Sequence, residues 1–152
     1  MRNVQLPSSP GSYVLMLRLV QERKLQIGKL GLFDFPAGIY VYCGSALGSG
    51  GLRGRLGHYL KDQSPVKWHV DYLHSYSELL EVIYLPTDER LECRWSQFFL
   101  IQPAAFVAAQ RFGASDCKNG CLAHLIGFPE DKFSEILRKF TLAWNCQRLP
   151  MQ

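Results

Sequence analysis

The segment that most constrains the fold is residues 11–20 (GSYVLMLRLV), which is β-prone and apolar at successive positions. Successive side chains of a strand point to opposite faces of its sheet, so a strand with apolar residues on both faces must be covered on both sides. The segment therefore predicts a central strand with packing on each of its faces.

The remaining pattern predicts a single α+β domain at residues 11–152, preceded by a short lead-in at residues 1–10. We expect strands at 24–28, 39–43, 79–85 and 121–127. We expect helices at 52–61, 65–74, 104–111 and 130–145, and one that Thr87 caps and Pro103 ends after Gln102. Residues 31–38, 44–51 and 112–120 are rich in turn formers and are expected to be turns or loops.

The composition restricts the class of protein and its expected cellular location. The 152 residues are 47% hydrophobic, enough for one core, and contain no apolar run long enough to cross a membrane. The five cysteines are unevenly placed, so we expect reduced thiols in a cytoplasmic protein. The formal net charge of +4 is mild, but a basic run at residues 52–67 could contact phosphate or simply be a solvated surface.

The stretch GIYVYCGSA joins a predicted strand to a glycine-rich loop. Alternation places Ile39, Val41 and Cys43 on one face of the strand and Tyr40 and Tyr42 on the other. The loop SALGSGG that follows leads into a helix, whose amino terminus favours anions. It lacks the Gly-Lys-Ser/Thr of a phosphate-binding P-loop, so on its own it is interpreted as a plain flexible turn, with an anion site as the alternative.

Helical geometry separates the two arginines of the next segment. Leu52, Leu56 and Tyr59 share a stripe that should face the core, and Arg55 lies beside it. Arg53 lies about 200° around the helix from Arg55. Arg55 is therefore the arginine that can serve a site beside the tyrosine strand, unless it is an ordinary surface residue.

Glu92 is the candidate carboxylate. It falls about 20° from Phe99 on a helical wheel and so borders the apolar face of its helix. A carboxylate in that position needs an arginine, a metal ion or hydrogen bonds. The alternative is a glutamate at a helix start, stabilised by the helix dipole.

In order, these residues resemble the GIY-YIG nuclease superfamily, in particular its compact stand-alone, Uri-type branch. The corresponding motifs are Gly11-Ser12-Tyr13, Tyr42-Cys43-Gly44, Leu52-x-x-Arg55-x-x-His58 and Glu92. The literal GIY at residues 38–40 is not the counterpart, because the family needs its two tyrosines on adjacent strands. The long interval between Tyr13 and Tyr42 requires an extra strand or hairpin at residues 21–37. The similarity spans roughly residues 11–128 and includes WHVDYL and FGASDC.

The resemblance implies a small, mainly antiparallel sheet flanked by helices and a metal-dependent endonuclease, acting on DNA rather than RNA. Arg55 would hold the phosphate, Tyr13 or Tyr42 would activate water, and His58 would support a phosphate or a phenol. Glu92 would ligate one Mg²⁺ or Mn²⁺. We expect substrate contacts from a further set of residues: Gly44, Ser45, Arg53, Lys61, His69 and Ser115.

Other interpretations remain open. A catalytically silent nucleic-acid-binding module could keep the same scaffold, and a homodimer or a protein partner could be needed for activity. Cys117, Cys121 and His124 have a spacing that suggests zinc, but a closed zinc site needs four ligands and the usual Cys-x-x-Cys pairs are absent. We therefore expect free thiols there and no zinc.

Overall fold

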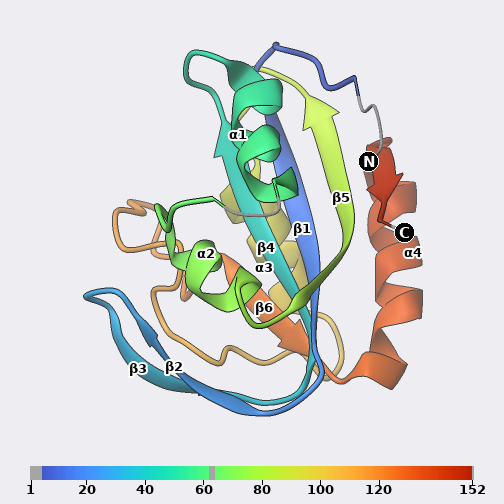
Figure 1. Cartoon of the computed structure of the whole chain (residues 1–152). Coiled ribbons are helices and arrows are strands. Elements are labelled where there is room, and N and C mark those ends of the chain that lie inside the picture. Colours follow the sequence, from blue (N-terminus) through green and yellow to red (C-terminus); the bar gives the residue numbers. More distant parts are fainter. Residues whose placement is uncertain (1–4, 62–63, 152) are drawn as a thin grey trace.

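The computed structural model describes residues 5–61 and 64–151 and contains a five-stranded antiparallel sheet in the order β6-β4-β1-β5-β7. The five strands are β1 (Gly11–Leu19), β4 (Gly38–Ala46), β5 (Glu78–Pro86), β6 (Leu125–Phe128) and β7 (Gln147–Pro150). β1 occupies the centre of the sheet, as its two apolar faces predict, and the α+β class is confirmed (Figure 1).

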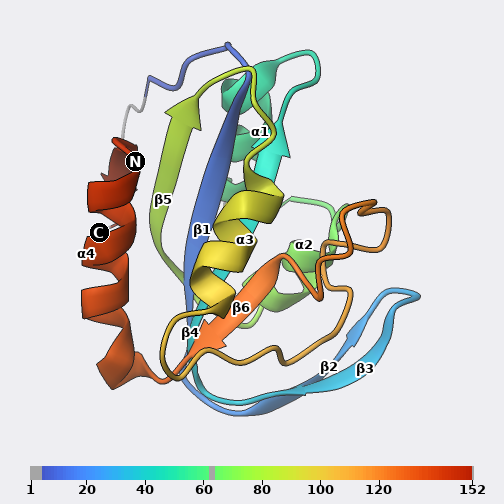
Figure 2. The same ribbon diagram turned by 180° about the vertical axis from the view of Figure 1, so that it is seen from behind.

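Helices cover both faces of this sheet. α1 (Gly51–Leu60) and α2 (His69–His74) lie in front of β1 and β4 in Figure 1. α3 (Glu92–Leu100) crosses the opposite face, and α4 (Phe133–Ala143) runs alongside β5 in Figure 2. A single 3-10 turn, η1 (Glu130–Lys132), leads into α4. The result is three layers, with a sheet between two layers of helices.

The two apolar cores follow the alternation of the strands. Tyr40 and Tyr42 of β4 belong to the cluster under α1 and α2, together with Leu52, Leu56 and Tyr59 of α1. The intervening residues of β4 belong to the cluster under α3 and α4: Ile39, Val41 and Cys43. The predicted faces of this strand and the predicted core stripe of α1 are therefore both confirmed.

A hairpin fills the interval between the two tyrosine strands. β2 (Arg23–Ile27) pairs with β3 (Gly31–Phe35), and this hairpin lies below α2 in Figure 1. The expected insertion at residues 21–37 is thus confirmed, but the turn expected at 31–38 is wrong. The turn lies at residues 28–30, and Gly28 and the first residue of β3, Gly31, have positive φ. Phe35 is fully buried and anchors β3 to the main core.

Three of the expected helices differ from the structure. Residues 104–111 are not helical, because Ala104 and Arg111 have positive φ and Phe106 instead forms a bridge with Gly127. The helix expected from residue 65 begins only at His69. The helix expected after Thr87 begins only at Glu92, and the Thr87 hydroxyl instead accepts a hydrogen bond from the Glu89 amide.

The residues just before β1 accept hydrogen bonds from the first turn of α1. Leu6 is buried, and the carbonyl oxygens of Pro7 and Ser9 accept hydrogen bonds from the amides of Arg53 and Leu52. The first amides of a helix have no partner within the helix, so this contact satisfies groups that would otherwise need solvent. Residues 1–4 of the expected lead-in lie outside the described residues.

The helices of the described part of the chain are short. The longest, α4, has 11 residues, and none has both the length and the hydropathy that a transmembrane span requires.

Arg148 of β7 should be important for stability, because it neutralises the buried carboxylate of Glu81 on β5. The side chain of Glu81 is only 7% exposed, and Arg148 Nη2 donates to Glu81 Oε1 at 2.9 Å. We predict that Arg148→Ala lowers the free energy of unfolding by about 1–3 kcal/mol, since it leaves a buried charge without its ionic partner. The matched control, Arg138→Ala, removes an exposed pair with Glu135 and should change little. Equal effects in urea denaturation would contradict this prediction.

Candidate functional site

The site lies where β4 passes the end of its neighbour β6. The two strands pair from Ile39 to Tyr42, and beyond that point the Cys43 amide donates to the His124 carbonyl at 2.9 Å. The later part of β4 is therefore bordered by a loop instead of a strand. A cavity of about 550 Å³ opens here, and residues from both faces of the sheet reach it.

The two candidate tyrosines lie on adjacent antiparallel strands, with their ring centroids 6.5 Å apart. Tyr13 is fully buried, and its hydroxyl lies 3.1 Å from that of Tyr59. Tyr42 lines the cavity, whereas Tyr13 lies behind it. Of the two phenols, Tyr42 is therefore the one that a molecule in the cavity could touch.

Arg55 contacts Tyr13 and also lines the cavity. Its Nη1 donates to the Tyr13 hydroxyl at 3.4 Å, and its guanidinium lies 4.2 Å from the ring centre of Trp68. A guanidinium on an aromatic face is held by a cation–π interaction and keeps its edge free for an anion. Arg53 is exposed and donates to the Leu6 carbonyl, so it points elsewhere, as the helical wheel predicts.

Burial keeps both phenols neutral. Desolvation raises the pKa of Tyr13, against the lowering effect of the Arg55 charge. Desolvation likewise raises the pKa of Tyr42, and Tyr13 and Glu92 add to the effect. Near neutral pH both hydroxyls therefore carry their protons and can donate hydrogen bonds.

Glu92, the first residue of α3, also lines the cavity. Its Oε1 lies 3.1 Å from Nη1 of Arg90, and its side chain is 16% exposed. The partner that this carboxylate requires is thus an arginine two residues earlier. Because the side chain of Arg90 is 60% exposed, the pair remains open to a ligand.

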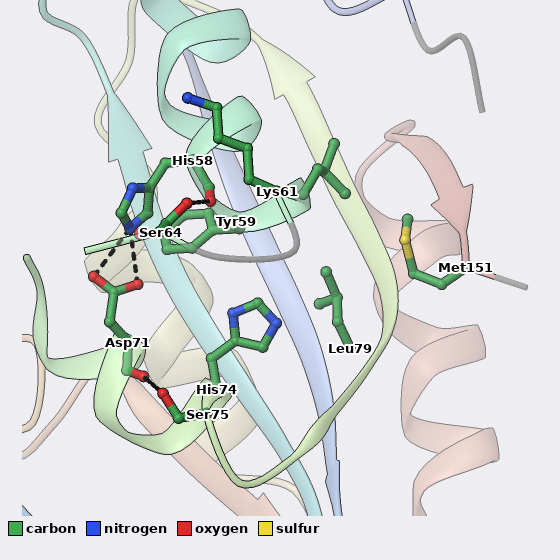
Figure 3. A pocket seen from close by; sticks show the side chains of 10 residues that line it. His58, Tyr59, Lys61, Ser64, Asp71, His74, Ser75, Leu79 and Met151 are labelled. Atoms are coloured by element: carbon green, nitrogen blue, oxygen red, sulfur yellow. Dashed lines mark hydrogen bonds and ion pairs between the residues drawn. The ribbon is translucent and has the colours of Figure 1, made fainter. Parts of the chain in front are cut away.

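His58 is not part of this group. Its Nε2 lies 3.0 and 3.1 Å from the two carboxylate oxygens of Asp71. One of these oxygens, Oδ2, also accepts hydrogen bonds from the amides of Lys67 and Trp68 just before α2. Figure 3 shows His58 pointing from α1 towards Asp71. It lines a second cavity, of about 600 Å³, together with Lys61. The histidine joins α1 to α2, so neither it nor Lys61 lies with Tyr42 and Glu92.

His69 and Ser115 support the loop that borders the cavity. The Gly113 amide donates to His69 Nδ1 at 2.8 Å, and burial lowers the pKa of this histidine, so its ring stays neutral and can accept that bond. Ser115 is exposed, and its carbonyl accepts a hydrogen bond from Arg111. Neither residue is among those that line the cavity.

Gly44 and Ser45 lie at the cavity as expected, but in different ways. Ser45 lines it, and its hydroxyl lies 3.1 Å from that of Ser12. Gly44 is the partner of Tyr13 across β1 and β4, and a Cβ there would lie 2.5 Å from the tyrosine ring. The glycine therefore makes room for the phenol instead of contacting a ligand.

The expectation of Mg²⁺ or Mn²⁺ with no zinc is wrong. Cys93 of α3 supplies the fourth ligand that the sequence lacked, and its sulfur lies within 4.8 Å of the donor atoms of Cys117, Cys121 and His124. Three thiols and an imidazole are donors for zinc, whereas magnesium and manganese prefer oxygen. Glu92 does not belong to this group. The fourth ligand was missed because it precedes Cys117 by 24 residues, and the Glu92-Cys93 pair in the first turn of a helix was its only signal.

The thiols of the cluster differ in acidity. Burial raises the pKa of Cys117, but hydrogen bonds from the backbone of Cys121 and Asn119 outweigh that effect and lower the pKa to about 6. Burial raises the pKa of Cys93 to about 12. Cys117 is therefore the thiol most ready to ionise and to bind a cation.

Gly44 offers a direct test of this arrangement. We predict that Gly44→Ala lowers the free energy of unfolding by about 1–3 kcal/mol, because the added methyl group overlaps the ring of Tyr13. Gly48→Ala in the following loop is the matched control, since a Cβ there meets nothing within 4 Å. Chemical denaturation of both variants measures the difference, and equal stability would show that Tyr13 does not pack against Gly44.

Comparison with known proteins gives one match. No curated protein and no solved structure matches the chain. The family described as Domain of unknown function DUF123 matches residues 12–144, a span that includes both tyrosines, Arg55, Glu92 and the whole Cys/His cluster. That description assigns no activity. The chain belongs to the DUF123 family.

Proposed function

We propose that this protein is an endonuclease that hydrolyses phosphodiester bonds in nucleic acid, with DNA as the preferred substrate. The observation that carries the proposal is the convergence of Tyr42, Arg55 and Glu92 on one open cavity. The motif resemblance to the GIY-YIG nuclease superfamily supports it, because these are the side chains that the resemblance assigns to the reaction.

Arg55 would bind the scissile phosphate. Its planar guanidinium can donate two hydrogen bonds to two phosphate oxygens, and Trp68 holds it in place. Arg90 and Lys118 add positive charge to the lining of the cavity, against Glu92 and Asp116. This distribution of charge favours binding of a polyanion and still places the carboxylate of Glu92 in the cavity.

The phenols would act as hydrogen-bond donors. Because burial raises the pKa of both tyrosines, neither ionises readily enough to remove a proton from water near neutral pH. Tyr42 can instead donate to a phosphate oxygen as negative charge develops there. Tyr13 would act through Arg55, whose position it fixes by their hydrogen bond.

Glu92 would accept the proton of the attacking water. A carboxylate beside the cavity can orient a water and take its proton as the oxygen–phosphorus bond forms and the bond to the leaving oxygen breaks. The ion pair with Arg90 fixes the position of the carboxylate.

The proposed setting is the cytoplasm, which fits five cysteines that are free thiols in the structure. The proposed site of each chain would cut one strand of a duplex. Cleavage of both strands would then require a second copy of the chain, a partner protein or two separate encounters.

A nicking assay tests the proposal. Wild-type protein is incubated with single-stranded, duplex and branched DNA and with RNA, across a panel of divalent cations. We predict cleavage that falls about 10²- to 10³-fold in Arg55→Ala, because a charge-stabilising donor is lost. Arg53→Ala, an exposed arginine on the same helix, is the matched control and should cleave normally.

The carboxylate has a control of the same kind. Glu92→Gln should lose cleavage while keeping DNA binding, whereas Glu89→Gln, at an exposed glutamate nearby, should retain both. If folded wild-type protein binds nucleic acid with a steep salt dependence but cuts none of the substrates, the protein is a silent binding module and the enzyme proposal is wrong.

A further inference from the structure

The connection between α3 and β6 is unusually long for a compact domain. Residues 101–124 separate the end of α3 at Leu100 from the start of β6 at Leu125 and include no helix or strand. Connections longer than about 12–15 residues without secondary structure are uncommon in such domains. A segment of this kind needs some other means of holding its shape.

Within the connection, backbone hydrogen bonds fix only some positions. Phe106 exchanges two hydrogen bonds with Gly127 of β6, and the His124 amide donates to the Phe112 carbonyl at 2.8 Å. Between these points, residues 115–120 are mostly exposed and belong to neither apolar cluster. It is here, and just after it, that Cys117 and Cys121 face Cys93 of α3.

Two donor–donor distances in this cluster are close to those around a tetrahedral metal ion. Cys93 Sγ lies 3.5 Å from Cys117 Sγ and 3.5 Å from His124 Nε2. With metal–sulfur distances of about 2.3 Å and metal–nitrogen distances of about 2.1 Å, zinc needs sulfurs about 3.8 Å apart and a sulfur and a nitrogen about 3.6 Å apart. All four donor atoms lie within 4.8 Å of one another, so small side-chain movements would bring them to one ion.

We infer that Cys93, Cys117, Cys121 and His124 bind one structural Zn²⁺ that fastens the 101–124 connection to α3. All four corners of the tetrahedron are protein ligands, so the ion has no open position for a reactant, as in closed structural sites. The ion would hold residues 115–120, which belong to neither apolar cluster.

Two side-chain amides surround the sulfurs in the way that zinc thiolates require. Asn119 Nδ2 donates to Cys93 Sγ at 3.3 Å, and Gln97 Nε2 donates to Cys121 Sγ at 3.8 Å. Hydrogen bonds of this kind spread the negative charge of the thiolates and orient them.

The ion would also shape the candidate active site. Asp116, Lys118 and Asn119 line the cavity of Tyr42 and lie next to or between two of the ligands in sequence. Loss of the metal would therefore release that wall of the cavity. The inference does not depend on the proposed nuclease function, because metal content can be measured without a substrate.

Elemental analysis of protein purified under reducing conditions tests the inference. We expect about one equivalent of zinc per wild-type chain. Cys121→Ser should lose the metal, and Cys146→Ser, which removes a thiol outside the cluster, should keep it. His124→Cys should also keep it, since four cysteines form an equally good zinc site, whereas His124→Ala should not.

Cobalt exchange gives a second measurement that needs no variant. Co²⁺ in the wild-type protein should show the charge-transfer and d–d absorption of a tetrahedral thiolate site, and chelation of the metal should lower the melting temperature. Wild-type protein that contains no zinc and gives no tetrahedral Co²⁺ spectrum would overturn the inference. A Cys93–Cys117 disulfide found by mass spectrometry under the same conditions would also overturn it.

Discussion

The antiparallel pairing of β1 with β4 sets Tyr13 opposite Gly44 and thereby positions the phenol that Arg55 of the candidate site contacts. The ring of Tyr13 occupies the space that a side chain at Gly44 would take. Its hydroxyl then meets Tyr59 and Arg55 of α1. The register between these two strands therefore fixes the position of the Tyr13 phenol, and through it that of the Arg55 guanidinium on α1.

The second requirement is that β6 is short and begins only opposite Tyr42. Because pairing with β4 stops at Tyr42, the edge of the sheet is open just where α1 approaches from one face and α3 from the other. Arg55 and Glu92 reach the same cavity from these opposite layers. The long connection before β6 closes the third side of the cavity, and the inferred zinc site would join that connection to α3. The proposed catalytic groups thus lie on rigid elements, and the inferred metal would hold one wall of the cavity.

Much of this arrangement follows from local pattern. The two apolar faces of β1, the alternation of Tyr40 and Tyr42 against Val41, and the separation of Arg53 from Arg55 depend only on the periods of strands and helices. Each of these was predictable from the sequence, and each is found in the structure.

What the sequence did not reveal depends on contacts between distant residues. The side chain of His58 is held by Asp71, a partner on another helix that no spacing rule connects to it. Residues 104–111 have a helix-forming composition. They do not form a helix, because Ala104 has a positive φ and Phe106 pairs with Gly127 of β6. Cys93 becomes a ligand only because α3 packs beside the loop of Cys117, so the metal prediction made from the sequence had one ligand too few.

The central claim is that the cavity lined by Tyr42, and not the second cavity lined by His58, receives the nucleic-acid phosphate. The most direct measurement is an NMR titration of the folded, metal-replete protein with a short DNA oligonucleotide that resists hydrolysis. The account predicts that the largest chemical-shift changes fall on Ser45, Gly113 and the Trp68 indole, which line or border the first cavity. Changes confined to His74, Ser75 and Met151 of the other cavity would contradict it.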